Sequence, residues 1–194
     1  MPISLFHDYQ PIDRYNRADL ARQFGDLAQL TGGEYNPVAL DWNWSGSNII
    51  VGDIYRRGFL ANLWIEHDWT VHTNLVVTLP SGIVWELRFN NVYGDASGVP
   101  IVGKPRVESD LHDRAVAALL PEHAYWSLTL ARQPFALTVS KARLSLATYR
   151  FYPCAFYLGA LDYLTEMAER VETLTRAPLP VRNSIVPVSL PWLE

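Results

Sequence analysis

The first regular pattern of hydrophobic and polar positions along the chain has the period of an α-helix. Its apolar members would share one face, and they are Leu20, Phe24, Leu27 and Leu30 or Thr31. Asn16 stands where an N-cap is favoured, Asp19 suits a first helical turn, and Gly32 suits a helix end. The pattern therefore predicts a helix from about residue 16 to residue 31, with its apolar face in the core.

From residue 35 to residue 93 the period changes to two, which is typical of strands with one buried face. In residues 83–89, IVWELRF, four large apolar side chains alternate with Val84, Glu86 and Arg88. The preceding LPSG, residues 79–82, has the residues of a hairpin turn. We therefore expect mostly antiparallel strands joined by short turns in this part of the chain.

Residues 59–66 and 70–77 are predicted to be the arms of one hairpin, with residues 67–69 at its tip. Glu66 then pairs with Thr70, and the side chains alternate between two faces. One face is nearly all apolar and holds Phe59, Ala61, Leu63, Ile65, Val71, Thr73, Leu75 and Val77. This face is expected to join the core.

Turn residues also delimit the next two segments. Residues 94–106 contain three glycines and two prolines, which predicts a loop. Residues 135–149 are predicted to form a second hairpin that turns near residues 140–142.

The longest helical pattern begins near Pro153 and runs to about Thr175. Its apolar face consists of Tyr157, Leu161, Leu164, Ala168 and Val171, and its charged residues lie elsewhere, at Glu166, Glu169, Arg170 and Glu172. Such a helix is expected to pack against a sheet.

Residues 109–120 permit two interpretations. Ser109 with Asp110 could cap a helix, or AVAALL, residues 115–120, could be a short buried strand. The helix is the preferred interpretation, and Pro121 suits the first position of another helix that follows it.

Composition limits the class of protein. The chain has 194 residues, of which 49% are hydrophobic, enough for one domain with a substantial core. Its net charge is −4 without a basic block, so we expect no nucleic-acid partner. Cys154 is the single cysteine, which excludes an intramolecular disulfide.

Neither a signal-peptide pattern nor an apolar run of about eighteen residues is present, which predicts a soluble, cytoplasmic protein without a membrane span.

The predicted architecture is α+β, with a mostly antiparallel sheet packed by an N-terminal helix and a long C-terminal helix. Residues 1–176 are expected to form this single domain, and residues 177–194 an extended, proline-rich tail. The outline is similar to that of helix-grip ligand-binding proteins, a likeness in the order of elements alone. That likeness implies a cavity for a small apolar ligand between the sheet and the long helix.

The densest cluster of side chains suited to metal binding or acid–base chemistry lies in the hairpin of residues 59–77. It comprises Glu66, His67, Asp68 and His72. In the predicted register His72 lies opposite Trp64, whereas His67 and Asp68 lie at the tip, so these groups do not converge. One bent strand is the alternative, with Glu66, Asp68 and His72 on one face at steps of about 7 Å. A metal would still need a ligand from elsewhere. We therefore interpret the cluster as the surface of a sheet.

Other candidate groups also have ordinary structural explanations. Cys154 stands at a predicted helix start, where a thiol can become a nucleophile, but a small buried side chain is the favoured interpretation. The other acidic and histidine candidates are Glu108, Asp110, His112, Asp113, Glu122 and His123. Asp110 and Asp113 suit the first turn of a helix capped by Ser109, His112 could pair with a carboxylate, and His123 beside Glu122 suits the first turn of the next helix. Neither a phosphate-binding glycine loop nor a nucleophile elbow is present. The sequence therefore predicts no catalytic residue, metal site or cofactor.

The C-terminal tail has four prolines yet remains apolar. Its candidate partner-binding residues are Ile185, Val188, Leu190, Trp192 and Leu193. An extended apolar peptide gains by docking on a groove or a sheet edge, although it could also fold back on its own domain. The favoured function is therefore a non-enzymatic interaction or assembly protein that binds a partner, or itself, through the tail. The alternatives are a binder of small apolar ligands and, less favoured, an enzyme that uses carboxylates and histidines.

Overall fold

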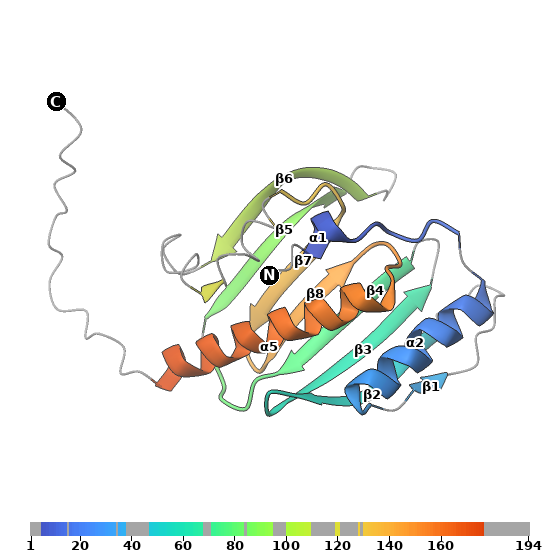
Figure 1. The fold of residues 1–194 in the computed structure, drawn as a ribbon. Coiled ribbons are helices and arrows are strands. Elements are labelled where there is room, and N and C mark those ends of the chain that lie inside the picture. The colour runs from blue at the N-terminus through green and yellow to red at the C-terminus, as the bar shows by residue number, and fades with distance from the viewer. Residues whose placement is uncertain are drawn as a thin grey trace, which may run out of the picture.

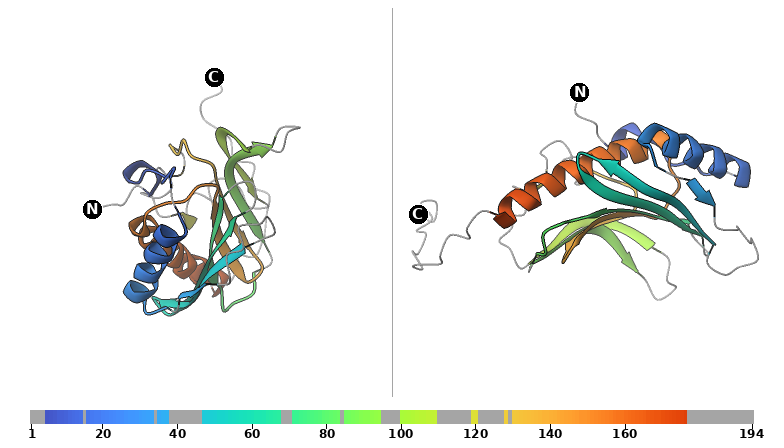
Figure 2. Two further views of the ribbon diagram at one scale, coloured as in Figure 1. Left: turned by 90° about the vertical axis from the view of Figure 1, so that its right-hand side faces the viewer. Right: turned by 90° about the horizontal axis from the view of Figure 1, so that it is seen from below.

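The fold is an antiparallel sheet with helices packed on one of its faces (Figures 1 and 2). The computed structural model describes residues 5–14, 16–33, 35–37, 47–67, 71–83, 85–94, 100–109, 119–120, 128 and 130–176. In this part of the chain the helices of at least one full turn are α1 (Leu5–Asp8), α2 (Arg17–Thr31) and α5 (Cys154–Arg176). The α+β class expected from the sequence is confirmed.

The described strands form one sheet in the order β1-β2-β3-β4-β8-β7-β5-β6, and every neighbouring pair is antiparallel. They are β1 (Tyr35–Pro37), β2 (Ser47–Arg56), β3 (Phe59–His67), β4 (Val71–Thr78), β5 (Glu86–Gly94), β6 (Pro100–Ser109), β7 (Phe135–Ser140) and β8 (Arg143–Thr148). The β7–β8 hairpin therefore fills the middle of the sheet, between strands that precede it in the chain. The face that bears the helices is called the helix face, and the opposite one the open face.

Helix α2 begins and ends as predicted. The side chain of Asn16 accepts a hydrogen bond from the amide of Asp19, and the carboxylate of Asp19 accepts one from the amide of Asn16. Gly32 ends the helix in the left-handed conformation, with φ of 69°. Phe24 and Leu27 are buried, but Leu30 is exposed, so the half-buried Thr31 continues the apolar face instead.

Helix α5 crosses the helix face of the sheet (Figure 1). All members of its predicted apolar stripe are buried, namely Tyr157, Leu161, Leu164, Ala168 and Val171. Glu172, predicted to lie on the charged side, is also buried. Its carboxylate accepts hydrogen bonds from the amide of Ser81 at 2.9 Å and from the Ser81 hydroxyl at 2.5 Å, which ties the end of α5 to the β4–β5 connection. No described helix is long and apolar enough to cross a membrane.

Strands β3 and β4 form the predicted hairpin, but their pairing is shifted by two residues. Glu66 pairs with His72 rather than with Thr70, so residues 68–70 join the strands. Because side chains alternate with a period of two, this shift leaves each of them on its predicted face. Phe59, Ala61, Leu63, Thr73, Leu75 and Val77 are accordingly all buried.

The prediction of a hairpin at residues 79–82 is wrong, since β8 and β7 lie between β4 and β5. The connecting segment instead runs along the β7–β8 turn. The amide of Leu79 donates to the carbonyl of Ala142, and the amide of Ile83 to the carbonyl of Lys141, both at 2.9 Å. Turn residues mark where a strand ends, but they do not specify which strand will lie beside it.

The predicted loop over residues 94–106 is also wrong in its second half, which belongs to the edge strand β6. Pro100 and Pro105 fit there, because one side of an edge strand needs no hydrogen-bond donors. Prolines together with Lys104 and Arg106 also oppose pairing of this edge with another chain.

Two tight turns place a basic residue in the left-handed conformation. The β2–β3 turn has Arg57 with φ of 51° followed by Gly58 with φ of 80°. The β7–β8 turn, at the predicted position, has Lys141 with φ of 50°, and Ser140 pairs with Arg143 across it. Arg57 forms an ion pair with Glu169 of α5 at 3.4 Å, whereas Lys141 forms no ion pair with a described residue.

Asn91 anchors the segment that leads into β7. Its side-chain amide donates to the carbonyl oxygens of Ala131, at 3.2 Å, and Gln133, at 2.8 Å. Its side-chain oxygen accepts a hydrogen bond from the amide of Phe135 at 2.9 Å. All of these groups lie at the buried side of β5, where Asn91 is 2% exposed.

Candidate functional site

The tail residues predicted to bind a partner, Ile185, Val188, Leu190, Trp192 and Leu193, lie outside the described residues. The same holds for Asp68, Asp110, His112, Asp113, Glu122, His123 and nearly all of the segment predicted as two helices. Ser109, expected to cap the first of these helices, is the last residue of β6 and pairs with Leu87. Glu108 is exposed on the open face of the same strand.

The histidine and carboxylate cluster becomes a row across the sheet. The corrected register places Asn48, Glu66 and His72 opposite one another on β2, β3 and β4, and Tyr149 directly follows Thr148, the β8 residue that pairs with Thr73. The ring of His72 packs edge-on against that of Tyr149, with centroids 4.9 Å apart. The row therefore brings Glu66 opposite His72, which the predicted register had kept apart. No group of three potential metal ligands occurs among the described side chains.

We expect the double variant Glu66→Gln with His72→Gln to retain the cellular function of the protein and to change its stability only modestly. The row contains one carboxylate and one histidine, whereas a structural zinc site needs four ligands. The measurement is a complementation assay together with elemental analysis of the purified protein. Stoichiometric zinc or manganese that disappears in the variant would show that the row is a metal site.

Cys154 has the properties of a structural thiol. It is the first residue of α5, and its amide donates to the side-chain oxygen of Gln23 at 2.9 Å. Burial, and to a smaller extent the charge of Asp26, raises the pKa of the Cys154 thiol. A nucleophilic cysteine needs the opposite shift, so the surroundings favour a structural role, although the side chain is half-buried and not fully buried as predicted.

The space between the sheet and α5 is filled by side chains. From the sheet, Leu63, Val77 and Leu144 are 0% exposed, as are Leu164 and Ala168 from the helix. A cavity large enough for water would leave accessible surface on the side chains that line it. At these positions the described interface therefore has no room for the ligand that a helix-grip protein would hold.

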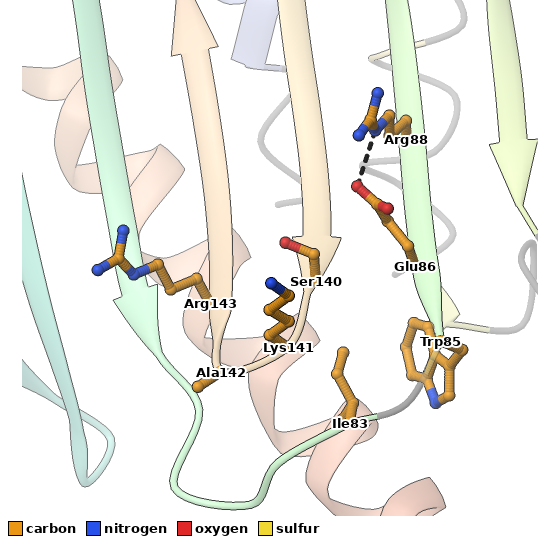
Figure 3. A pocket seen from close by; sticks show the side chains of 8 residues that line it. All are labelled: Ile83, Trp85, Glu86, Arg88, Ser140, Lys141, Ala142 and Arg143. Carbon is orange, nitrogen blue, oxygen red and sulfur yellow. Dashed lines mark hydrogen bonds and ion pairs between the residues drawn. The ribbon is translucent and has the colours of Figure 1, made fainter.

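A hollow of about 750 Å³ lies at one end of β5 and the β7–β8 hairpin (Figure 3). It is lined by Ile83, Trp85, Glu86, Arg88, Ser140, Lys141, Ala142 and Arg143, and is called the basic hollow here. Its polar members Glu86, Arg88, Ser140 and Arg143 alternate with the buried Leu87, Val139 and Leu144. These polar side chains therefore lie on the open face, whereas Ile83 and Trp85 contribute to the lining from the side of the core.

Of the charged side chains in the basic hollow, Arg88 and Glu86 form an ion pair with each other. Arg88 donates from Nε to Glu86 at 2.8 Å, and this hydrogen bond and the charge of Glu86 raise the pKa of Arg88. Lys141 and Arg143 are exposed and form no ion pair with another described residue. Figure 3 shows that Arg143 points away from the Arg88–Glu86 pair. Among the described residues, Lys141 and Arg143 thus have no ion-pair partner, and the half-buried ring of Trp85 lines the same hollow.

A second hollow, of about 320 Å³, lies between the β2–β3 turn and α5. Its charged members are largely occupied with one another or with the backbone, because Arg57 pairs with Glu169 and Glu172 binds Ser81. These contacts join the sheet to the end of the helix. We therefore assign this hollow a structural role.

The basic hollow could not be predicted from the sequence. Its residues come from two segments, 83–88 and 140–143, which the sequence presents as parts of two unrelated hairpins. They meet only because β7 lies beside β5, a pairing between strands that are distant in the chain. No local pattern of residues signals this neighbourhood.

Comparison with known proteins identifies no family. No family model matches the chain, and no curated protein matches it. Among solved structures, the chain is similar to the mycobacterial trehalose monomycolate transport factor A, TtfA, at 15% sequence identity and a TM-score of 0.47. The similarity covers 87% of this chain and 100% of that one. A likeness at this level assigns no function.

Proposed function

We propose that this protein is a non-enzymatic interaction protein that binds a protein partner, or a second copy of itself, through residues 177–194. The observation that carries the proposal is the composition of this tail. It keeps Ile185, Val188, Leu190, Trp192 and Leu193 although its prolines are incompatible with a helix. Extended apolar segments of this kind are suited to grooves and sheet edges of other proteins.

The described part of the chain supports this choice over the two alternatives. The sheet and α5 fill the space between them, which disfavours a small apolar ligand there. The described side chains hold no group of three potential metal ligands, and burial raises the pKa of Cys154, which disfavours the enzyme hypothesis.

Trp192 is the expected anchor, because tryptophan is enriched among the residues that dominate binding energy. We expect Trp192→Ala in the full chain to weaken binding by about 2 kcal/mol or more, roughly thirtyfold, with an unchanged melting temperature. Sedimentation measures self-association, and affinity capture followed by titration with the purified partner measures binding to another protein. The matched control is Asn183→Ala, a polar tail position that is expected to bind as the wild type does.

Truncation after Arg176 separates the proposal from its alternative. If the tail serves a partner, the shortened protein keeps its melting temperature and loses the association. If the shortened protein unfolds or aggregates by itself, the tail belongs to the core of its own domain and the proposal is wrong.

A further inference from the structure

We propose that the basic hollow binds an acidic peptide segment of a partner protein, one that carries an aromatic or other flat apolar side chain among its carboxylates. This surface is built from β5 and the β7–β8 hairpin and shares no residue with the tail. The inference therefore goes beyond the proposed function and does not depend on it.

The first support is charge. The chain carries a net charge of −4, yet the hollow is lined by three basic residues and one acidic residue. Glu86 is already engaged by Arg88 at 2.8 Å, so Lys141 and Arg143 remain to attract an anion. Complementary charges of this kind speed association and select the partner more than they add affinity.

The second support is a comparison between the two tight turns. Lys141 and Arg57 both occupy the left-handed region, which glycine or asparagine adopts with less strain. For Arg57 the structure provides a reason, because its side chain reaches Glu169 of α5 at 3.4 Å. Lys141 has no such contact among the described residues and is exposed. Strained residues concentrate at functional sites, and binding an external anion would give Lys141 a role comparable to that of Arg57.

The third support is shape. Pockets for small molecules are typically concave and bury most of the ligand, whereas the polar lining of the basic hollow lies on the open face of a sheet. One wall carries Trp85, whose ring is half-buried and packs partly against the core. Ser140, the last residue of β7, adds a hydroxyl to the lining. An aromatic side chain and two cations that line one hollow fit a chain segment with one flat apolar group and flanking carboxylates.

The test uses the full-length protein and a fluorescein-labelled peptide with glutamates on both sides of one tryptophan, followed by fluorescence anisotropy at low salt. The matched probe has lysines in place of the glutamates. We expect the acidic peptide alone to bind, and added salt to weaken it. Lys141→Gly and Arg143→Gln are each expected to lower its affinity by about three- to tenfold, and the double variant by more than tenfold.

Lys141→Gly also separates binding from folding. Glycine removes the charge and relieves the left-handed strain, so the melting temperature should stay the same or rise while the affinity falls. Lys141→Asn is the second variant, since asparagine also tolerates this conformation. The matched control is Arg132→Gln, which removes another exposed arginine. Arg132 lies just before the start of β7, whereas Ser140 and the basic hollow lie at the end of that strand. It is expected to bind as the wild type does.

Three results would overturn the proposal. The wild type could bind both peptides equally, or the Lys141 and Arg143 variants could bind as tightly as the wild type. Inorganic phosphate or a DNA duplex could also displace the acidic peptide at lower concentrations and show the same dependence on Lys141, which would make the assigned occupant wrong. The Trp192→Ala chain keeps the hollow intact and should bind the peptide normally, so this proposal and the tail proposal fail separately.

Discussion

Replacing Leu164 with alanine is expected to lower the free energy of unfolding by about 2–5 kcal/mol. Leu164 is 0% exposed and lies on the face of α5 that packs against the sheet. The substitution removes apolar contacts and leaves a cavity in a filled core, and both effects destabilise the folded state. Urea unfolding followed by circular dichroism measures the change, and Leu161→Ala on the same stripe should behave similarly.

The matched control is Leu174→Ala on the same helix. Leu174 is 47% exposed, so its truncation should change the free energy of unfolding by only about 0.5 kcal/mol. If the Leu164 and Leu174 variants lose the same amount of stability, α5 does not pack on the sheet through the predicted stripe.

The second large effect is expected for Asn91→Ala, at about 2–5 kcal/mol. The change removes three hydrogen bonds and leaves the buried amide of Phe135 and the carbonyls of Ala131 and Gln133 without those partners. A buried polar group without a partner costs about 1–3 kcal/mol. Hydrogen exchange should also report faster exchange of the Phe135 amide, because the start of β7 loses its anchor.

Asn90→Ala is the control for this prediction. Asn90 precedes Asn91 in the same strand but is half-exposed on the open face. Its loss is expected to change stability by about 0.5 kcal/mol or less. Equal losses for Asn90→Ala and Asn91→Ala would mean that the amide network does not stabilise the fold.

Helices α2 and α5 could be predicted because their signals are local, whereas the short α1 was not predicted. Asn16, Asp19 and Gly32 specify both ends of α2 within its own sequence. The apolar stripe of α5 repeats with the helical period, and every member of it is buried. The burial of Glu172 could not be predicted, since it depends on Ser81, a residue 91 positions away.

In the sheet, the β3–β4 and β7–β8 hairpins and the buried faces could be predicted, but the order of the strands could not. The alternation of apolar and polar residues predicts correctly which described side chains of β3 and β4 face the core, yet a shift of two residues leaves it unchanged, so it does not specify the register. The neighbours of β4 and β5 depend on pairing with β8 and β7, for which the sequence holds no local signal. The candidate site could not be predicted for the same reason, because the basic hollow exists only through the contact of β5 with β7.

The position of the β7–β8 hairpin has a consequence for the chain while it is being made. Thr73 of β4 and Thr148 of β8 hydrogen-bond through their side chains, although they lie 75 positions apart. At about 5–20 residues per second, a ribosome adds β8 roughly 4–15 s after β4. During that interval the β2–β4 meander has an edge that no later strand of the chain yet covers. Unpaired strand edges promote aggregation, so the nascent chain is more vulnerable to it than the finished sheet, whose β6 edge carries prolines and basic residues.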